Sequence, residues 1–97
     1  IEVRQTEHYS KWFDKLKDRV ARTRIDIRIR RLSLGNPGDV KSVGHGLSEL
    51  RIDYGPGYRV YFTRRGTQLI ILLAGGDKTT QASDIKKALK LAQEIEE

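Results

Sequence analysis

Polar and apolar side chains alternate on both sides of a Gly-Pro-Gly turn at residues 55–57, and the polar positions are candidates for chemistry. This alternation predicts a β-hairpin with one apolar and one polar face. With residues 55–57 as the loop, Asp53 lies opposite Arg59 and Arg51 lies opposite Tyr61. A guanidinium suits a phosphate, and a tyrosine ring can stack on a base. The polar face therefore predicts a nucleic-acid-binding patch; the alternative is a solvated face with an Asp53–Arg59 ion pair.

Two further residues that could take part in catalysis or binding lie close to glycines. His45 lies between two glycines, where a ligand can approach the backbone closely; the alternative is an exposed loop residue. Lys78 follows a Gly-Gly-Asp sequence at the end of a predicted strand, so we expect it beside Arg51 and Arg59, unless the glycines only end the strand. With two histidines, no cysteine and no paired carboxylates at metal-ligand spacing, we expect no metal and no cofactor.

The composition is that of a small basic protein. Its 97 residues suit one domain, which we expect to span residues 1–97. Lys and Arg outnumber Asp and Glu by 19 to 13, and the net charge of +6 favours polyanionic partners. No apolar run approaches the roughly 20 residues of a membrane helix, and we expect no membrane partner. A chain without cysteine is compatible with a reducing cytosol, and we expect a cytoplasmic location. Six arginines between residues 19 and 31 form either a solvated helix face or a contact surface for phosphates or an acidic partner.

The first part of the chain is predicted to be mainly helical. Residues 2–6 are a weak strand candidate. Residues 7–33 have apolar side chains at helical spacing, interrupted near Lys17–Asp18, which predicts two helices. A strand over Ile25–Ile29 is the competing interpretation. Residues 34–39 contain the Gly-Asn-Pro-Gly signal of a turn.

The rest of the chain is predicted to form a sheet and a final helix. Residues 40–46 are a loop or an irregular strand, and the hairpin follows. Residues 68–74 are nearly all apolar, as in a strand covered on both faces. An amphipathic helix ends the chain, with Thr79, Thr80 or Ser83 as its N-cap. The predicted class is α+β: an N-terminal helical hairpin, a mostly antiparallel twisted β-sheet and a C-terminal helix.

Several sequence blocks together resemble a known protein family. They are GNPGDVK at 35–41, GHG at 44–46, ELRI at 49–52, YGPGYRVYF at 54–62, LLAGGDKTTQ at 72–81 and DI at 84–85. In this order and spacing, from Trp12 to Ala92, the chain resembles the phage-derived Gp49-like, HigB-like "addiction module killer" branch of the RelE/ParE toxin superfamily. The resemblance implies the same small basic α+β fold and the toxin of a type II toxin–antitoxin pair.

The superfamily contains two modes of toxicity. RelE- and HigB-type members cut mRNA in the ribosomal A site without a metal, whereas ParE-type members inhibit DNA gyrase. The resemblance thus implies a ribosome-dependent endoribonuclease that inhibits translation. The alternatives are a gyrase inhibitor without catalysis and a decayed nucleic-acid-binding homologue. The implied partners are the ribosome, mRNA and a cognate helix-turn-helix antitoxin in a hetero-oligomer.

The resemblance also implies roles for individual residues. The catalytic arginine of the family falls on Arg59, and its basic residues on the preceding strand and after the last strand fall on Arg51 and Lys78. The predicted catalytic residues are Arg59, Lys78 and His45, and the predicted RNA contacts are Arg51, Tyr61 and Lys41. The general base stays open between His45, Asp53 and Tyr61, because residues 81–85 lack the tyrosine that RelE has in its C-terminal segment.

Overall fold

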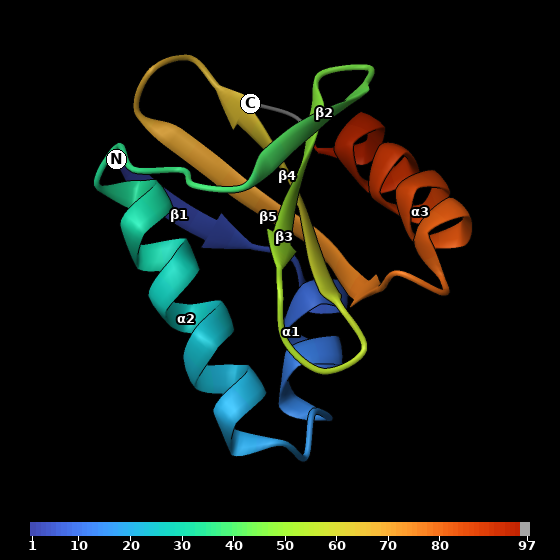
Figure 1. The fold of residues 1–97 in the computed structure, drawn as a ribbon. Coiled ribbons are helices and arrows are strands. Elements are labelled where there is room, and N and C mark those ends of the chain that lie inside the picture. Colours follow the sequence, from blue (N-terminus) through green and yellow to red (C-terminus); the bar gives the residue numbers. More distant parts are fainter. Residues whose placement is uncertain (96–97) are drawn as a thin grey trace.

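The computed structural model describes residues 1–95, which form five strands and three helices (Figure 1). The elements in chain order are β1 (Glu2–Gln5), α1 (Glu7–Asp14), α2 (Arg19–Ser33), β2 (Val40–Gly44), β3 (Leu47–Ile52), β4 (Tyr58–Arg65), β5 (Leu69–Asp77) and α3 (Gln81–Glu94). The predicted α+β class and the order of the elements are confirmed. None of the helices in these residues is long and apolar enough to cross a membrane.

Helices α1 and α2 begin at residues whose side chains accept hydrogen bonds from unpaired amides of the first helical turn. The Thr6 hydroxyl accepts a 3.0 Å hydrogen bond from the amide of Tyr9 and donates a 2.7 Å bond to the carbonyl of Leu73 in β5. Asp18 caps α2 by accepting from the amides of Val20 and Ala21. The predicted helix break near Lys17–Asp18 is therefore confirmed, and the competing strand over Ile25–Ile29 is wrong.

The sheet has the order β1-β5-β4-β3-β2 and lies between two helical layers (Figure 1). The β1–β5 pair is parallel and the other three pairs are antiparallel. On one face, α1 and α2 cover a core that includes Leu50, Val60 and Leu72. On the other face, α3 covers Tyr61 and Leu73. Both faces of the central strands are therefore buried over much of their length.

The hairpin of β3 and β4 has a different register from the predicted one. Arg51 lies opposite Arg59, and Glu49 lies opposite Tyr61. The predicted Asp53–Arg59 pair is wrong, because Asp53 has already left the ladder. Side chains alternate with a period of two along a strand, so this displacement by two residues changes the partners but keeps every side chain on its predicted face.

The segment of residues 40–46 is an irregular strand followed by a tight turn. A bulge interrupts the β2–β3 pairing between Ser42 and Gly44. His45 follows with a φ of 55° in the left-handed region. At the other end of the sheet, Thr80 is the N-cap residue of α3. One of its three predicted candidates is thus the observed one.

Arg28 fastens α2 to the end of β3. Its Nη1 donates a 2.6 Å hydrogen bond to the carbonyl of Arg51. Its Nη2 donates 3.2 Å bonds to the carbonyls of Pro37 and Asp39 in the loop before β2. The carbonyl of Asp39 also accepts a 3.0 Å hydrogen bond from the amide of Arg51, so the guanidinium and the backbone together tie the loop before β2 to the end of β3. Not all arginines of α2 therefore belong to a solvated face.

Candidate functional site

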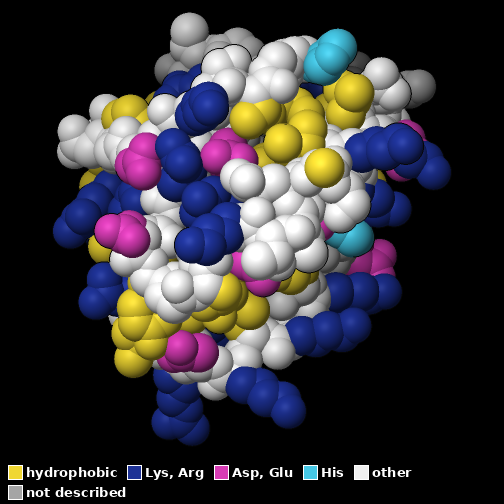
Figure 2. All heavy atoms as spheres, turned by 45° about the vertical axis from the view of Figure 1, so that its right-hand side comes forward, with side chains coloured by type: hydrophobic (Ala, Val, Ile, Leu, Met, Phe, Trp, Pro, Cys, Tyr) yellow, Lys and Arg dark blue, Asp and Glu magenta, His cyan; other side chains and the backbone are white. Residues whose placement is uncertain are grey.

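A pocket of about 270 Å³ opens beside the turn that joins β3 to β4. Its lining combines three cations, two carboxylates and two turn glycines: Arg51, Arg59, Lys78, Asp39, Asp53, Gly55 and Gly57, with Ile52 beneath them. Sequence reasoning placed Arg51, Arg59 and Lys78 near one another, and the pocket contains all three. Figure 2 shows Lys and Arg side chains spread over the face of the molecule that it displays, with Asp and Glu between them. The pocket is thus distinguished by its geometry rather than by charge alone.

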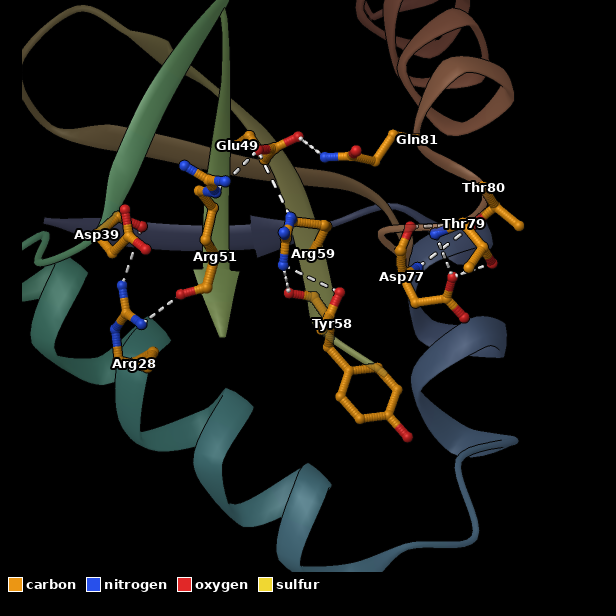
Figure 3. Close-up of polar contacts among 11 residues, drawn as sticks. Arg28, Asp39, Glu49, Arg51, Tyr58, Arg59, Asp77, Thr79, Thr80 and Gln81 are labelled. Atoms are coloured by element: carbon orange, nitrogen blue, oxygen red, sulfur yellow. Dashed lines mark hydrogen bonds and ion pairs between the residues drawn. The ribbon is translucent and has the colours of Figure 1, made fainter. Parts of the chain in front are cut away.

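Arg59 is held firmly at the floor of this pocket. Its Nη1 donates hydrogen bonds of 3.0 and 3.1 Å to the carbonyls of Gly57 and Tyr58 in its own turn (Figure 3). Its Nε lies 3.6 Å from a carboxylate oxygen of Glu49, and the residue is only 8% exposed. Among residues 1–95, Nη2 has no hydrogen-bond partner. That nitrogen is therefore the donor left for an anion in the pocket.

Glu49 is the residue that joins the two arginines. Its Oε1 lies 3.5 Å from Nε of Arg51 and 3.6 Å from Nε of Arg59, and its Oε2 accepts a 3.0 Å bond from Gln81 at the start of α3 (Figure 3). Glu49 is 3% exposed, and a buried carboxylate is tolerated only when it is paired. The alternation of the predicted hairpin puts Glu49 on the same polar face as Arg51, but alternation alone assigns it no role. Its position near two arginines on the same face was the signal that could have predicted an ion pair.

Neutralising Glu49 should destabilise the fold as well as the site. In Glu49→Gln the shape is kept, but the charge that compensates the buried guanidinium of Arg59 is lost. We expect the free energy of unfolding to fall by about 2–3 kcal/mol, measured by urea denaturation. Glu7→Gln is the matched control, because Glu7 forms an exposed pair with Lys11, and it should change stability by less than about 0.5 kcal/mol. Equal effects of the two substitutions would contradict a structural role for the buried pair.

Tyr61 does not belong to the exposed surface of the site. The residue is 0% exposed and packs beneath α3 with Ala88 and Leu73. The prediction that its ring stacks on a base is therefore wrong, because α3 covers the ring. Burial raises the pKa of the Tyr61 hydroxyl, and the carboxylate of Glu49 raises it further. A hydroxyl with a raised pKa is a poor general base near neutral pH.

His45 and Lys41 lie away from the pocket. His45 is in the turn before β3, whereas Arg51 is near the end of that strand, and six residues of extended chain span about 20 Å. The prediction that His45 acts together with Arg59 is wrong, because the two residues mark opposite ends of the hairpin. Lys41 on β2 pairs with Glu49 and is exposed. It therefore lies on the same face as Arg51, at the edge strand of the sheet.

Lys78 and Arg59 approach the same turn glycine from two strands. A Cβ added to Gly57 would lie 3.2 Å from Cδ of Lys78 and 3.4 Å from Nη1 of Arg59. Gly57 has a φ of 79°, so the turn also needs glycine for its backbone conformation. Next to Lys78, Asp77 accepts hydrogen bonds from the hydroxyl and amide of Thr79, which lower the pKa of its carboxyl group. The hydrogen bonds of Asp77 thus order the turn that follows β5, in which Lys78 lies.

The arrangement suits one tetrahedral anion. Three cations from β3, β4 and the end of β5 converge on a pocket whose turn glycines leave its mouth open. The carboxylates of Asp39 and Asp53 stand on the same lining and could accept a proton. No group of three His, Cys, Asp or Glu side chains within residues 1–95 is placed to hold a metal ion. The chemistry that these residues can perform is electrostatic stabilisation of a phosphate together with proton transfer.

Comparison with protein families identifies the chain. The model of the family described as "Phage derived protein Gp49-like (DUF891)" matches residues 11–95. The chain belongs to this family. A relative from Haemophilus influenzae, named "Uncharacterized protein", is 52% identical over 95 residues, which is 98% of this chain and 96% of the relative. This match extends over all the residues that line the pocket.

The Gp49-like fold of this chain is also the fold of a solved toxin. The structure of a variant of the E. coli toxin RelE in the free state superimposes with a TM-score of 0.72. The match covers 91% of this chain and 93% of RelE, at 15% sequence identity. The architecture is thus shared although few residues are. The predicted resemblance to the Gp49-like family is confirmed, and so is the predicted likeness to the RelE fold.

Proposed function

We propose that the protein is the toxin of a toxin–antitoxin pair and acts as a metal-independent endoribonuclease on mRNA at the ribosome. Membership of the Gp49-like family and the RelE fold support the toxin role. The observation that carries the nuclease activity is the convergence of Arg51, Arg59 and Lys78 on one small pocket. A pocket of that size accommodates a single phosphate rather than a folded RNA.

The proposed reaction is attack of a ribose 2′-oxygen on the adjacent phosphate. The bond from the 2′-oxygen to phosphorus forms, the bond from phosphorus to the 5′-oxygen breaks, and the products are a 2′,3′-cyclic phosphate and a 5′-hydroxyl. Negative charge grows on the phosphate oxygens in the transition state, where Nη2 of Arg59 and the ammonium of Lys78 would stabilise it. Arg51 would hold the backbone in place.

Proton transfer is assigned to the carboxylates of the pocket. With Tyr61 buried and His45 distant, Asp53 is the remaining predicted base, and Asp39 stands on the same lining. One carboxyl group would take the proton from the 2′-hydroxyl, and its conjugate acid or water would protonate the leaving 5′-oxygen. A pocket with no strong base suits a substrate whose geometry is already imposed by the ribosome.

The test is to induce the protein in a bacterial host without an antitoxin and to map mRNA 5′ ends after a few minutes. We expect clustered, in-frame cleavages within translated codons, and none when initiation is blocked. Growth arrest in which the messages stay intact and double-strand DNA breaks appear would overturn the proposed nuclease activity and indicate gyrase as the target. A silent induction with normal protein levels would indicate a toxin that has lost its activity.

A further inference from the structure

A second and larger hollow, the α2 groove, lies between α2 and the end of β3. It measures about 610 Å³. Its lining comes mainly from one side of α2 and combines apolar with basic side chains: Arg19, Val20, Thr23, Arg24, Ile27, Arg28, Arg31, Ile52 and Asp53. Of these residues, the proposed nuclease pocket uses only Ile52 and Asp53. The α2 groove and the nuclease pocket therefore adjoin but differ in chemistry.

Two apolar side chains are exposed in the α2 groove. Val20 is 50% exposed and Ile27 is 43% exposed. Residues seven positions apart lie on one side of a helix, so the two side chains form one stripe. Only four large hydrophobic residues among residues 1–95 are exposed, and two of them form this stripe. Such a stripe on a helix is typical of a surface that another chain covers.

The basic side chains around the stripe are partly fixed in advance. The guanidinium of Arg24 lies 4.9 Å from the centre of the Tyr54 ring, and the Tyr54 hydroxyl donates a 2.8 Å hydrogen bond to Asp18 at the start of α2. Arg28 is held by three backbone carbonyls. Side chains that are already ordered lose less conformational entropy when they bind. The α2 groove is thus prepared for an acidic partner.

We propose that the α2 groove binds an acidic amphipathic helix of a partner protein. The partner's apolar side chains would cover Val20 and Ile27, and its carboxylates would meet Arg19, Arg24 and Arg31. A nucleic acid fits less well, because a phosphate backbone would pair with the arginines but leave the apolar stripe exposed to water. Only the identity of the partner as an antitoxin rests on the proposed function. Because the groove shares Asp53 with the nuclease pocket, an occupant would also restrict access to that pocket.

The test uses the full chain and two designed peptides of identical composition. Each is about 16 residues, roughly four helical turns, built from Leu, Glu, Ala and Gln; one places Leu on a single face flanked by Glu, and the other has a scrambled order. Fluorescence anisotropy should show at least about tenfold tighter binding of the patterned peptide. The double variant Val20→Ser/Ile27→Ser should abolish that preference. Leu34→Ser is the matched control, because Leu34 is 69% exposed at the end of the same helix, and its binding should be unchanged.

Three results would overturn the proposal. The first is equal binding of both peptides, and the second is an unaltered preference in the double variant. The third is displacement of the patterned peptide by single-stranded RNA that binds the double variant and the wild type with equal affinity. The nuclease proposal is tested separately by mRNA cleavage, which the double variant should retain. Peptide preference without cleavage in any variant would support the α2 groove and overturn the nuclease alone.

Discussion

Replacing Arg59 with alanine should lower mRNA cleavage by about 100-fold or more, because it removes the pocket guanidinium that two turn carbonyls hold in one orientation. Its Nη1 is bound to the carbonyls of Gly57 and Tyr58, so Nη2 is presented to the pocket without further ordering. Cleavage is measured as the rate of message loss in a reconstituted translation system. Glu49 keeps Arg51 and Gln81 as partners in this variant, so we expect it to stay folded by circular dichroism.

Two companion variants make the result on Arg59 specific. Arg64→Ala removes an exposed arginine from the same strand, outside the lining of the pocket, and should cleave at the wild-type rate. Arg59→Lys keeps the charge but loses the two-pronged guanidinium, so its rate should lie between those of the wild type and Arg59→Ala. A wild-type rate for Arg59→Ala would refute the assignment of the pocket as the cleavage site. An equal loss in Arg64→Ala would show that only net charge matters.

The hairpin illustrates what local sequence can predict and what it cannot. Alternation predicted correctly which side chains share a face, because that depends only on the period of a strand. The register was wrong because the loop is longer than its glycines suggest. Tyr54 leaves the ladder to form a hydrogen bond with Asp18 and to lie beneath Arg24. Both partners come from α2 or its cap, more than 25 residues away in sequence, so no local pattern contains this information.

That a helix covers the polar face of the hairpin could be predicted in part from the sequence. The apolar run that became β5 was correctly expected to be buried on both sides, and β4 is its neighbour in the sheet. A helix over β5 on that side also reaches Tyr61, so the run itself was evidence against an exposed tyrosine. What the sequence could not provide was the angle of α3. That angle buries Tyr61 and Glu49 but leaves Arg51 half-buried at the pocket.

The prediction for His45 was wrong for a different reason, which is its distance from the pocket. Its flanking glycines and its ring made it a chemically reasonable candidate, and the loop conformation is indeed unusual, with a φ of 55°. Local features, however, give no distance between segments. The turns at the two ends of β3 are equally rich in glycine, and only the strand between them determines that Arg59 is near one turn and His45 near the other.

Gly75→Ala should cause a large loss of stability, because the added methyl group would overlap the ring of Trp12. The new Cβ would lie 2.5 Å from Cδ2 of Trp12 and closer still to two other atoms of its ring. Trp12 has little room to move, because its ring packs against those of Tyr9 and Tyr58 at centroid distances of 5.7 and 6.3 Å. We expect the free energy of unfolding to fall by about 3 kcal/mol. In thermal denaturation this corresponds to a fall in Tm of roughly 12–24 °C.

A double-mutant cycle with Trp12 tests whether the loss of stability comes from overlap with the Trp12 ring or from a strand that tolerates no side chain at this position. If the ring is the obstacle, Gly75→Ala should cost less than about 1 kcal/mol in a Trp12→Leu background, giving a coupling of about 2 kcal/mol or more. A full cost in both backgrounds would locate the problem in the strand itself. Gly75 lies next to Gly76, which pairs with Arg59 and lets Asp84 pack over the strand. The two glycines thus let α1 and α3 approach opposite faces of β5 beside the pocket of Arg51, Arg59 and Lys78. Close helix packing, rather than a turn or the end of a strand, is therefore the reason for glycine at these positions.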